Sequence, residues 1–248
     1  MLFSNFFDIK EHIKGCLDFY NDAKDVYQPM LDYLKFIEDN DLKLPYIQIS
    51  DYNANGMHFN MENPTDPKSP FVAFVRAAGL STKTSQNAGG SFGFGKAAYF
   101  YLSPIRTILV STLTKDNNCF FEGVASLCTH YYKDESKMAI GYYDSLGGLP
   151  ISDNNLIPRR FRRVREDRDS NSPGTDIYIM GLKGKFESLE EAKNDIYNQM
   201  TLAVLRHFWM AIYEGMLVVT IGQTVLNKES LLDEMEAVFT DSRKLLTI

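Results

Sequence analysis

Cysteine and histidine are scarce in this chain of 248 residues. The three cysteines, Cys16, Cys119 and Cys128, are widely spaced and odd in number, which argues against a disulfide framework and against a cysteine-ligated zinc site. The four histidines are scattered, without the spacing of a metal site or of a catalytic triad. We therefore interpret both residue types as structural.

Long apolar runs and a basic excess are missing as well. No stretch approaches the roughly 18 consecutive apolar residues of a membrane-spanning helix. The N-terminus, MLFSNFFDIKEHIK, lacks the basic region, apolar run and cleavage site of a signal peptide. The net charge of −6 is also unlike the basic surface of a nucleic-acid-binding protein. We expect a cytoplasmic protein that binds neither a membrane nor, in general, nucleic acid.

One segment departs from this acidic balance. Residues 159–168 contain six arginines: Arg159, Arg160, Arg162, Arg163, Arg165 and Arg168. They form either a solvated loop or edge strand balanced by Glu166, Asp167 and Asp169, or a surface that grips phosphates or an acidic partner. The first interpretation is favoured because runs of charge usually lie in solvent.

Hydrophobic periodicity predicts a globular α+β chain. Helical spacing covers residues 6–38, broken at Pro29, and recurs at 188–213 and from Lys228. Strand patterns cover residues 45–50, 106–112, 119–127, 138–143, 176–180 and 216–221. Strands gather centrally and helices at both ends, which favours a two-layer α+β sandwich over an alternating parallel sheet. We expect a single domain over residues 1–248, with a core at about 9–180 and a helix–strand–helix extension at about 186–248.

The most informative segment is GGSFGFGK at residues 89–96, which runs into AAYF. Its glycines let the backbone approach a ligand closely, and the helix that follows offers unpaired N–H groups to anionic oxygens. The small, polar stretch from Gly79 to Gly90 before it, which contains Ser81, Thr82 and Lys83, is expected to be a mobile lid. The two together predict a phosphate cradle with a cover.

Two further elements accompany this cradle. Asp51 ends the strand expected at 45–50, before a turn that Gly56 permits. Thr175 stands at the entrance of the apolar strand expected at 176–180. An acid at a strand end, a glycine cradle and a threonine at a strand entrance are therefore candidates for one site.

The order of acid turn (DYNANGM), lid, cradle (GGSFGFGK), strand hairpin and Gly-Thr strand (GTDIYI) resembles the GHKL superfamily. That superfamily comprises the ATP-binding domains of the gyrase B subunit, the ninety-kilodalton heat-shock chaperones, sensor histidine kinases and MutL. The resemblance covers about residues 9–180 and is strongest to chaperone-like and MORC-like proteins, including bacterial ones. It implies a Bergerat-type fold, a mixed sheet with helices on one face and ATP between sheet and lid.

Roles for individual residues come from this resemblance. Asp51 would accept a hydrogen bond from the adenine amino group, with Thr175 supporting it through water, and Gly56 and Met57 would form the pocket floor. Asn53 stands where the family has the first glycine of the acid turn, a position that asparagine tolerates. The phosphates would be wrapped by the backbone of Gly90, Ser91, Phe92, Gly93, Phe94 and Gly95, with the charge of Lys96 near the outer ones.

The first helix departs from the family pattern of glutamate and asparagine four residues apart, and two registers fit it. One makes Asp18 the catalytic base and Asp22 the Mg²⁺ ligand, which suits the one-face i,i+4 spacing and the hard metal. Aspartate is shorter than glutamate, so we expect slow hydrolysis in this register. The other makes Asn21 the metal ligand and leaves Leu17 in the base position, which implies a binder with little activity.

The resemblance implies a Mg²⁺-dependent ATPase that uses ATP as a conformational switch, with a homodimer or a partner protein reading it. The bacterial relatives add phage defence as an expected setting. One alternative is a nucleotide-gated binding module without turnover. Another is a P-loop kinase, since residues 90–96 fit G-x-x-x-x-G-K, but Ala97 follows instead of serine or threonine and no strand leads into Gly90.

Overall fold

The computed structural model describes residues 3–19, 24–40, 42–76, 94–145, 147–166, 171–182 and 189–245. Within these ranges, the side chains of residues 3–7, 94–96, 189 and 240–245 are not described. The chain forms two compact units, Met1–Lys183 and Gly184–Ile248. Their boundary falls between the expected end of the core and the expected start of the extension.

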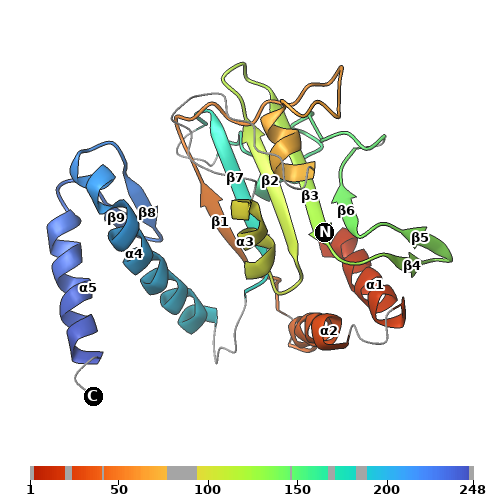
Figure 1. Ribbon diagram of the computed structural model, residues 1–248, viewed down its shortest axis with the longest axis horizontal. Coiled ribbons are helices and arrows are strands. Elements are labelled where there is room, and N and C mark those ends of the chain that lie inside the picture. The colour runs from red at the N-terminus through yellow and green to blue at the C-terminus, as the bar shows by residue number, and fades with distance from the viewer. Residues whose placement is uncertain are drawn as a thin grey trace. The chain divides into compact units, whose positions relative to one another are not determined.

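The first unit is an α+β structure built on a five-stranded antiparallel sheet (Figure 1). Its helices are α1 (Phe3–Phe19), α2 (Lys24–Asp39), the π-helical turn η2 (Val72–Arg76), α3 (Phe94–Leu102) and the 3-10 turn η3 (Arg159–Phe161). Its strands are β1 (Tyr46–Ser50), β2 (Thr107–Leu113), β3 (Cys119–Ser126), β4 (His130–Tyr132), β5 (Glu135–Lys137), β6 (Ile140–Tyr143) and β7 (Gly174–Met180). The sheet order is β1-β7-β2-β3-β6, and β4 and β5 form a separate hairpin.

Every strand pair in the described part of the chain is antiparallel, which corrects the mixed sheet that the resemblance implied. The late strand β7 enters between β1 and β2, so that Tyr178 lies opposite Gln48 on one side and Leu109 on the other. Both β2 and β7 are buried at every residue. Strands buried on both faces read as apolar runs, which is why their sequences do not alternate.

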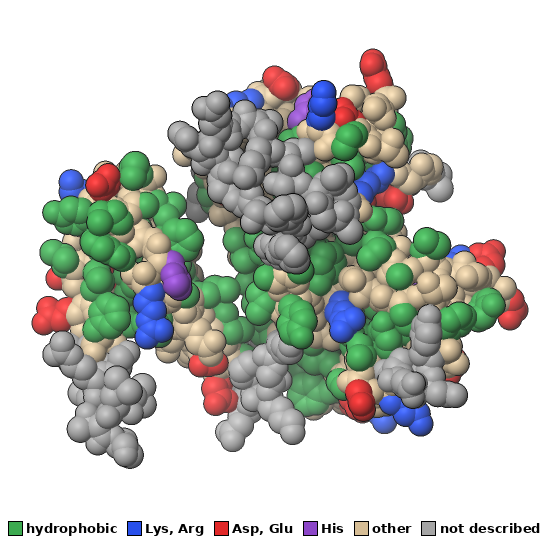
Figure 2. Space-filling view, in the orientation of Figure 1, with side chains coloured by type: hydrophobic (Ala, Val, Ile, Leu, Met, Phe, Trp, Pro, Cys, Tyr) green, Lys and Arg blue, Asp and Glu red, His purple; other side chains and the backbone are tan. Residues whose placement is uncertain are grey.

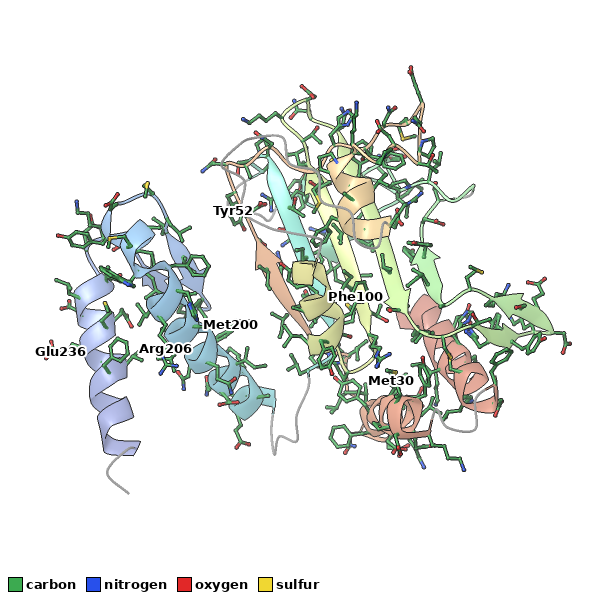
Figure 3. The ribbon with its side chains drawn as sticks, in the orientation of Figure 1. Met30, Tyr52, Phe100, Met200, Arg206 and Glu236 are labelled. Carbon is green, nitrogen blue, oxygen red and sulfur yellow. The ribbon has the colours of Figure 1, made fainter. Side chains whose placement is uncertain are left out.

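Helices cover both faces of this sheet, whereas the resemblance implied helices on one face. Leu109 and Tyr178 share a core with side chains of α1 and α2, including Met30. The neighbouring Ile108 faces the opposite core, which contains side chains of η2 and is flanked by Phe100 of α3. Figure 3 labels Met30 and Phe100, one from each core. Central strands that are apolar on both sides need a covering layer on each.

The described residues at the start of the chain form two helices, and the expected break at Pro29 is not found. That proline lies inside α2, as its sixth residue. At this position its missing N–H removes only one hydrogen bond near the helix start, the one to the carbonyl of Asp25. The interruption instead follows Phe19, where α1 ends.

The second unit contains α4 (Leu189–Tyr213), β8 (Val219–Ile221), β9 (Thr224–Leu226) and α5 (Leu231–Leu245). Its core includes Leu205, Ile212 and Leu226, which are fully buried. Phe208 and Trp209 of α4 stay half-exposed, and Figure 2 shows hydrophobic side chains on the visible surface of this unit. Among the described residues, no helix is both long enough and apolar enough to cross a bilayer.

A buried ion pair ties η2 to β3 in the first unit. Arg76 donates through Nε to both carboxylate oxygens of Glu122, at 3.0 and 3.1 Å, and through Nη2 at 2.7 Å. The guanidinium also lies over the rings of Phe59 and Tyr142. Glu122 is fully buried. Burial raises its pKa to about 7, and the hydrogen bonds and charge of Arg76 oppose that rise.

This raised pKa predicts a pH-dependent stability. The folded chain holds the Glu122 proton more tightly than the unfolded chain, whose carboxyl titrates near 4.5. The resulting stabilisation is complete below pH 4.5 and is lost as the pH rises to about 7. Urea unfolding should show that the free energy of unfolding of wild type falls by about 1–3 kcal/mol relative to that of Glu122→Gln between pH 4.5 and 8. Parallel profiles for the two proteins would mean that Glu122 ionises normally.

Candidate functional site

A cavity of about 350 Å³ lies beside the C-terminal end of β1. This is at the lower end of the range of small-molecule sites, roughly 300–1,000 Å³. It is lined by Ile49, Ser50, Asp51, Ala54, Asn55, Gly56, Met57, Phe74, Tyr99, Thr175 and Ile177. Four residues expected from the sequence to form an adenine site, namely Asp51, Gly56, Met57 and Thr175, therefore line one cavity.

Asp51 is held against β7 by its own main chain and by one carboxylate oxygen. Its N–H donates to the carbonyl of Thr175 at 3.0 Å, which continues the β1–β7 ladder beyond Ser50. Its Oδ1 accepts the Thr175 N–H. No donor to Oδ2 is found among the residues whose side chains are described. One oxygen is thus fixed by the fold, and the other is an acceptor that a ligand N–H can satisfy.

The turn after Asp51 needs two residues with positive φ. Asn53 has φ 57° and Gly56 has φ 68°, so asparagine does adopt the left-handed conformation for which it was considered suitable. A side chain at Gly56 would collide with the carbonyl oxygen of Leu113 at the end of β2. Glycine therefore lets this turn lie against β2, where the N–H of Met57 donates to the Thr112 hydroxyl at 2.8 Å.

Thr112 organises the floor of the cavity, and sequence reasoning missed it. Its hydroxyl donates its single proton to the carbonyl of Gly174 at 3.0 Å, because a carbonyl can only accept. The Thr175 hydroxyl, 3.1 Å away, is then the donor to Thr112. Thr175 consequently presents oxygen lone pairs, which can accept a hydrogen bond from a water or a ligand. No sequence motif marks Thr112, since its partners come from two distant segments.

Two aromatic side chains form an apolar wall of the cavity. The rings of Phe74 and Tyr99 lie 5.9 Å apart between centroids, at an interplanar angle of 57°. Burial, and secondarily the charge of Asp51, raise the pKa of the Tyr99 phenol. Tyr99 therefore stays neutral near pH 7. A carboxylate acceptor and two aromatic side chains that line one cavity suit a planar heterocycle with an exocyclic amino group.

A buried cation, whose role the sequence did not reveal, packs against the acid turn. Arg163 is fully buried and donates through Nη1 to Asp176 at 2.6 Å. It was expected to be either solvated or free to grip phosphates, and it is neither. The sequence did indicate a buried cation through Asp176, since an aspartate inside the apolar strand GTDIYIM requires a buried partner. Arg159 and Arg160 of the same segment are exposed.

Asp18 is not brought to this cavity. It lies on α1, which packs through Ile13 and Cys16 on the Leu109 side of the sheet. The cavity lies on the other face of the sheet. Thr175, which lines it, points to the same face of the sheet as Ile177, two residues along β7. Ile177 pairs with Val110, which points to the same face as Ile108. Asp18 is exposed and follows Cys16 by two residues, about 200° around the helix. In Figure 1, α1 runs downward from the chain's N label, away from the upper end of β1.

The remaining expected site residues are outside what the structure describes. Asn21, Asp22, Ser81, Thr82, Lys83 and Gly90–Gly93 lie outside the described residues, and only the backbone is described for Phe94, Gly95 and Lys96. α3 begins at Phe94, inside the cradle segment 89–96 and not after it as expected. Within the described side chains, no group of three or more histidine, cysteine, aspartate or glutamate residues is arranged to hold a metal.

No family model matches the chain, and no curated protein matches it in sequence.

Proposed function

We propose that the first unit binds the adenine nucleotide ATP, with Mg²⁺, in the cavity beside Asp51. The observation that carries this proposal is the Asp51 carboxylate, whose Oδ1 accepts the Thr175 N–H and whose Oδ2 has no donor among the described residues. Adenine offers such a donor in its exocyclic amino group. The Thr175 hydroxyl, which accepts, suits a bridging water beside it.

Continuity with the glycine cradle supports a nucleotide rather than a free base. Tyr99 of α3 lines the cavity, and α3 starts within the cradle segment 89–96. N–H groups at a helix start suit phosphate oxygens. Base and phosphate sites would thus be joined through one short helix. This arrangement supports a GHKL-like ATP site, although the antiparallel sheet with helices on both faces departs from the Bergerat-type pattern that the resemblance implied.

A binding module without turnover is the second candidate, and the placement of Asp18 favours it over a hydrolase. The sheet separates Asp18 from the cavity, so this carboxylate is not available to activate a water at a bound phosphate. The metal ligands implied by the resemblance, Asp22 or Asn21, lie outside the described residues. We propose that ATP acts chiefly as a cytoplasmic conformational signal, read by a second copy of the chain or by a partner protein, with phage defence as its setting.

Calorimetric titration with a non-hydrolysable ATP analogue tests the binding proposal. Asp51→Ala should weaken binding about 10- to 100-fold, because a charge-assisted hydrogen bond is lost. Asp116→Ala, in the exposed turn between β2 and β3, is the matched control and should bind as wild type does. Equal affinity in wild type and Asp51→Ala would remove the adenine assignment.

Phosphate release separates the two candidates. If ATP only signals, wild type and Asp18→Ala should show the same negligible rate. A measurable rate in wild type that Asp18→Ala abolishes would instead restore the ATPase, and would require α1 to reach the nucleotide in another conformation.

A further inference from the structure

Arg163 joins the acid turn to the interior of the sheet. Its Nη2 donates to the carbonyl of Asp51 at 2.5 Å and to the carbonyl of Ser172 at 3.1 Å, while Nη1 holds Asp176 at 2.6 Å. The guanidinium also lies 4.7 Å from the ring centroid of Tyr52. Figure 3 labels Tyr52 at the upper end of β1, beside β7. One planar cation therefore contacts both chain segments that form the Asp51 site.

The same two segments are also connected by hydrogen bonds from main-chain N–H groups of the acid turn. Ala54 donates to the carbonyl of Pro173 at 3.2 Å, and the Asn53 N–H donates to the Ser172 hydroxyl at 3.3 Å. The segments lie so close together that no side chain fits at Gly174. A Cβ there would lie 2.6 Å from Arg163 Nη2 and would also collide with Asp51. The turn is thus packed directly against the guanidinium.

The geometry required of Arg163 is specific to arginine. Both ions of the pair are fully buried, so Asp176 needs the charge, and the fork of Nη1 and Nη2 lets the same group bind a carboxylate and carbonyls at once. A lysine offers a single nitrogen. It can pair with Asp176 or hold the Asp51 carbonyl, but it does not reproduce the planar fork.

We propose that Arg163 is a positioning residue of the nucleotide site, which anchors the Asp51 carbonyl to Asp176 and so directs Asp51 Oδ2 toward the base. The inference rests on the proposed adenine site. Arg163 does not itself line the cavity. Its effect is therefore on the direction of the Asp51 carboxylate. Arg163 should thereby determine the preference for adenine over guanine. Adenine has a donor in its exocyclic amino group, whereas guanine presents an acceptor oxygen at that place.

The test compares Arg163→Met and Arg163→Lys with wild type, using non-hydrolysable ATP and GTP analogues. We expect both variants to lose about tenfold or more in affinity for the ATP analogue, with a smaller preference over the GTP analogue. Hydrogen exchange of the Thr175 amide is the second readout and should become faster in both. If Arg163→Met does not fold, Arg163→Lys alone decides, since it keeps a cation beside Asp176.

Leu34→Ala is the matched control for lost stability. Leu34 is buried in α2, in the core on the other side of the sheet from the cavity. It should lower the melting temperature without changing nucleotide preference or Thr175 exchange. Arg163 variants that match Leu34→Ala in both readouts would overturn the positioning role. A wild type that binds neither analogue would instead overturn the proposed function, and the nucleotide role of Arg163 with it.

Discussion

Replacing Asp176 by alanine is expected to lower the free energy of unfolding of the first unit by about 3–5 kcal/mol, because it leaves the Arg163 cation buried without its counter-ion. Both side chains are fully inaccessible to solvent, so water cannot replace the lost carboxylate. Arg163 Nε already lacks a hydrogen-bond partner among the described residues. Urea unfolding of wild type and Asp176→Ala measures the difference.

A double variant separates the cost of the orphaned cation from the net value of the pair. Asp176→Leu combined with Arg163→Met removes both charges and should be more stable than Asp176→Ala alone, since replacing a buried pair by apolar groups is often neutral. A loss below about 1 kcal/mol in Asp176→Ala would be typical of an exposed ion pair and would contradict the buried one.

The second large effect is expected at Gly174, where an alanine should impair both folding and ligand binding. Gly174 has φ 151°, a conformation that costs other residues about 1–3 kcal/mol. The added Cβ would also lie 2.7 Å from Asp51 Oδ1 and would overlap the Asp51 carbonyl oxygen. The acid turn must move to make room, so the ATP analogue should bind at least about tenfold more weakly, as expected when a site is displaced.

Gly141→Ala is the control for this substitution. Gly141 lies in β6, and a Cβ there meets nothing within 4 Å. Its variant should match wild type in calorimetry and in urea unfolding. Wild-type affinity in Gly174→Ala would show that the segment around Gly174 does not determine the position of Asp51.

The local parts of the candidate site could be predicted from the sequence. Asp51 follows a short strand with a turn behind it, and Thr175 opens an apolar strand, so each could be placed by its immediate neighbours. Pairing of β1 with β7 then brings the two residues together. The left-handed Asn53 also follows from a local property of asparagine.

Features that depend on packing could not be predicted. The periodicity of α1 identifies a helix but not the face of the sheet on which it packs, and that choice separates Asp18 from the cavity. Arg163 has the same sequence signature as its solvated neighbours Arg159 and Arg160. Its partner Asp176 is 13 positions away along the chain, and nothing in a charge pattern relates the two.

A crystal structure of the chain with a bound ATP analogue tests the adenine site most directly. We expect the adenine amino group within hydrogen-bond distance of Asp51 Oδ2, the ring beside Tyr99, and the phosphates at the start of α3. A nucleotide bound elsewhere on the chain, with the cavity beside Asp51 left empty, would contradict the proposed recognition of adenine.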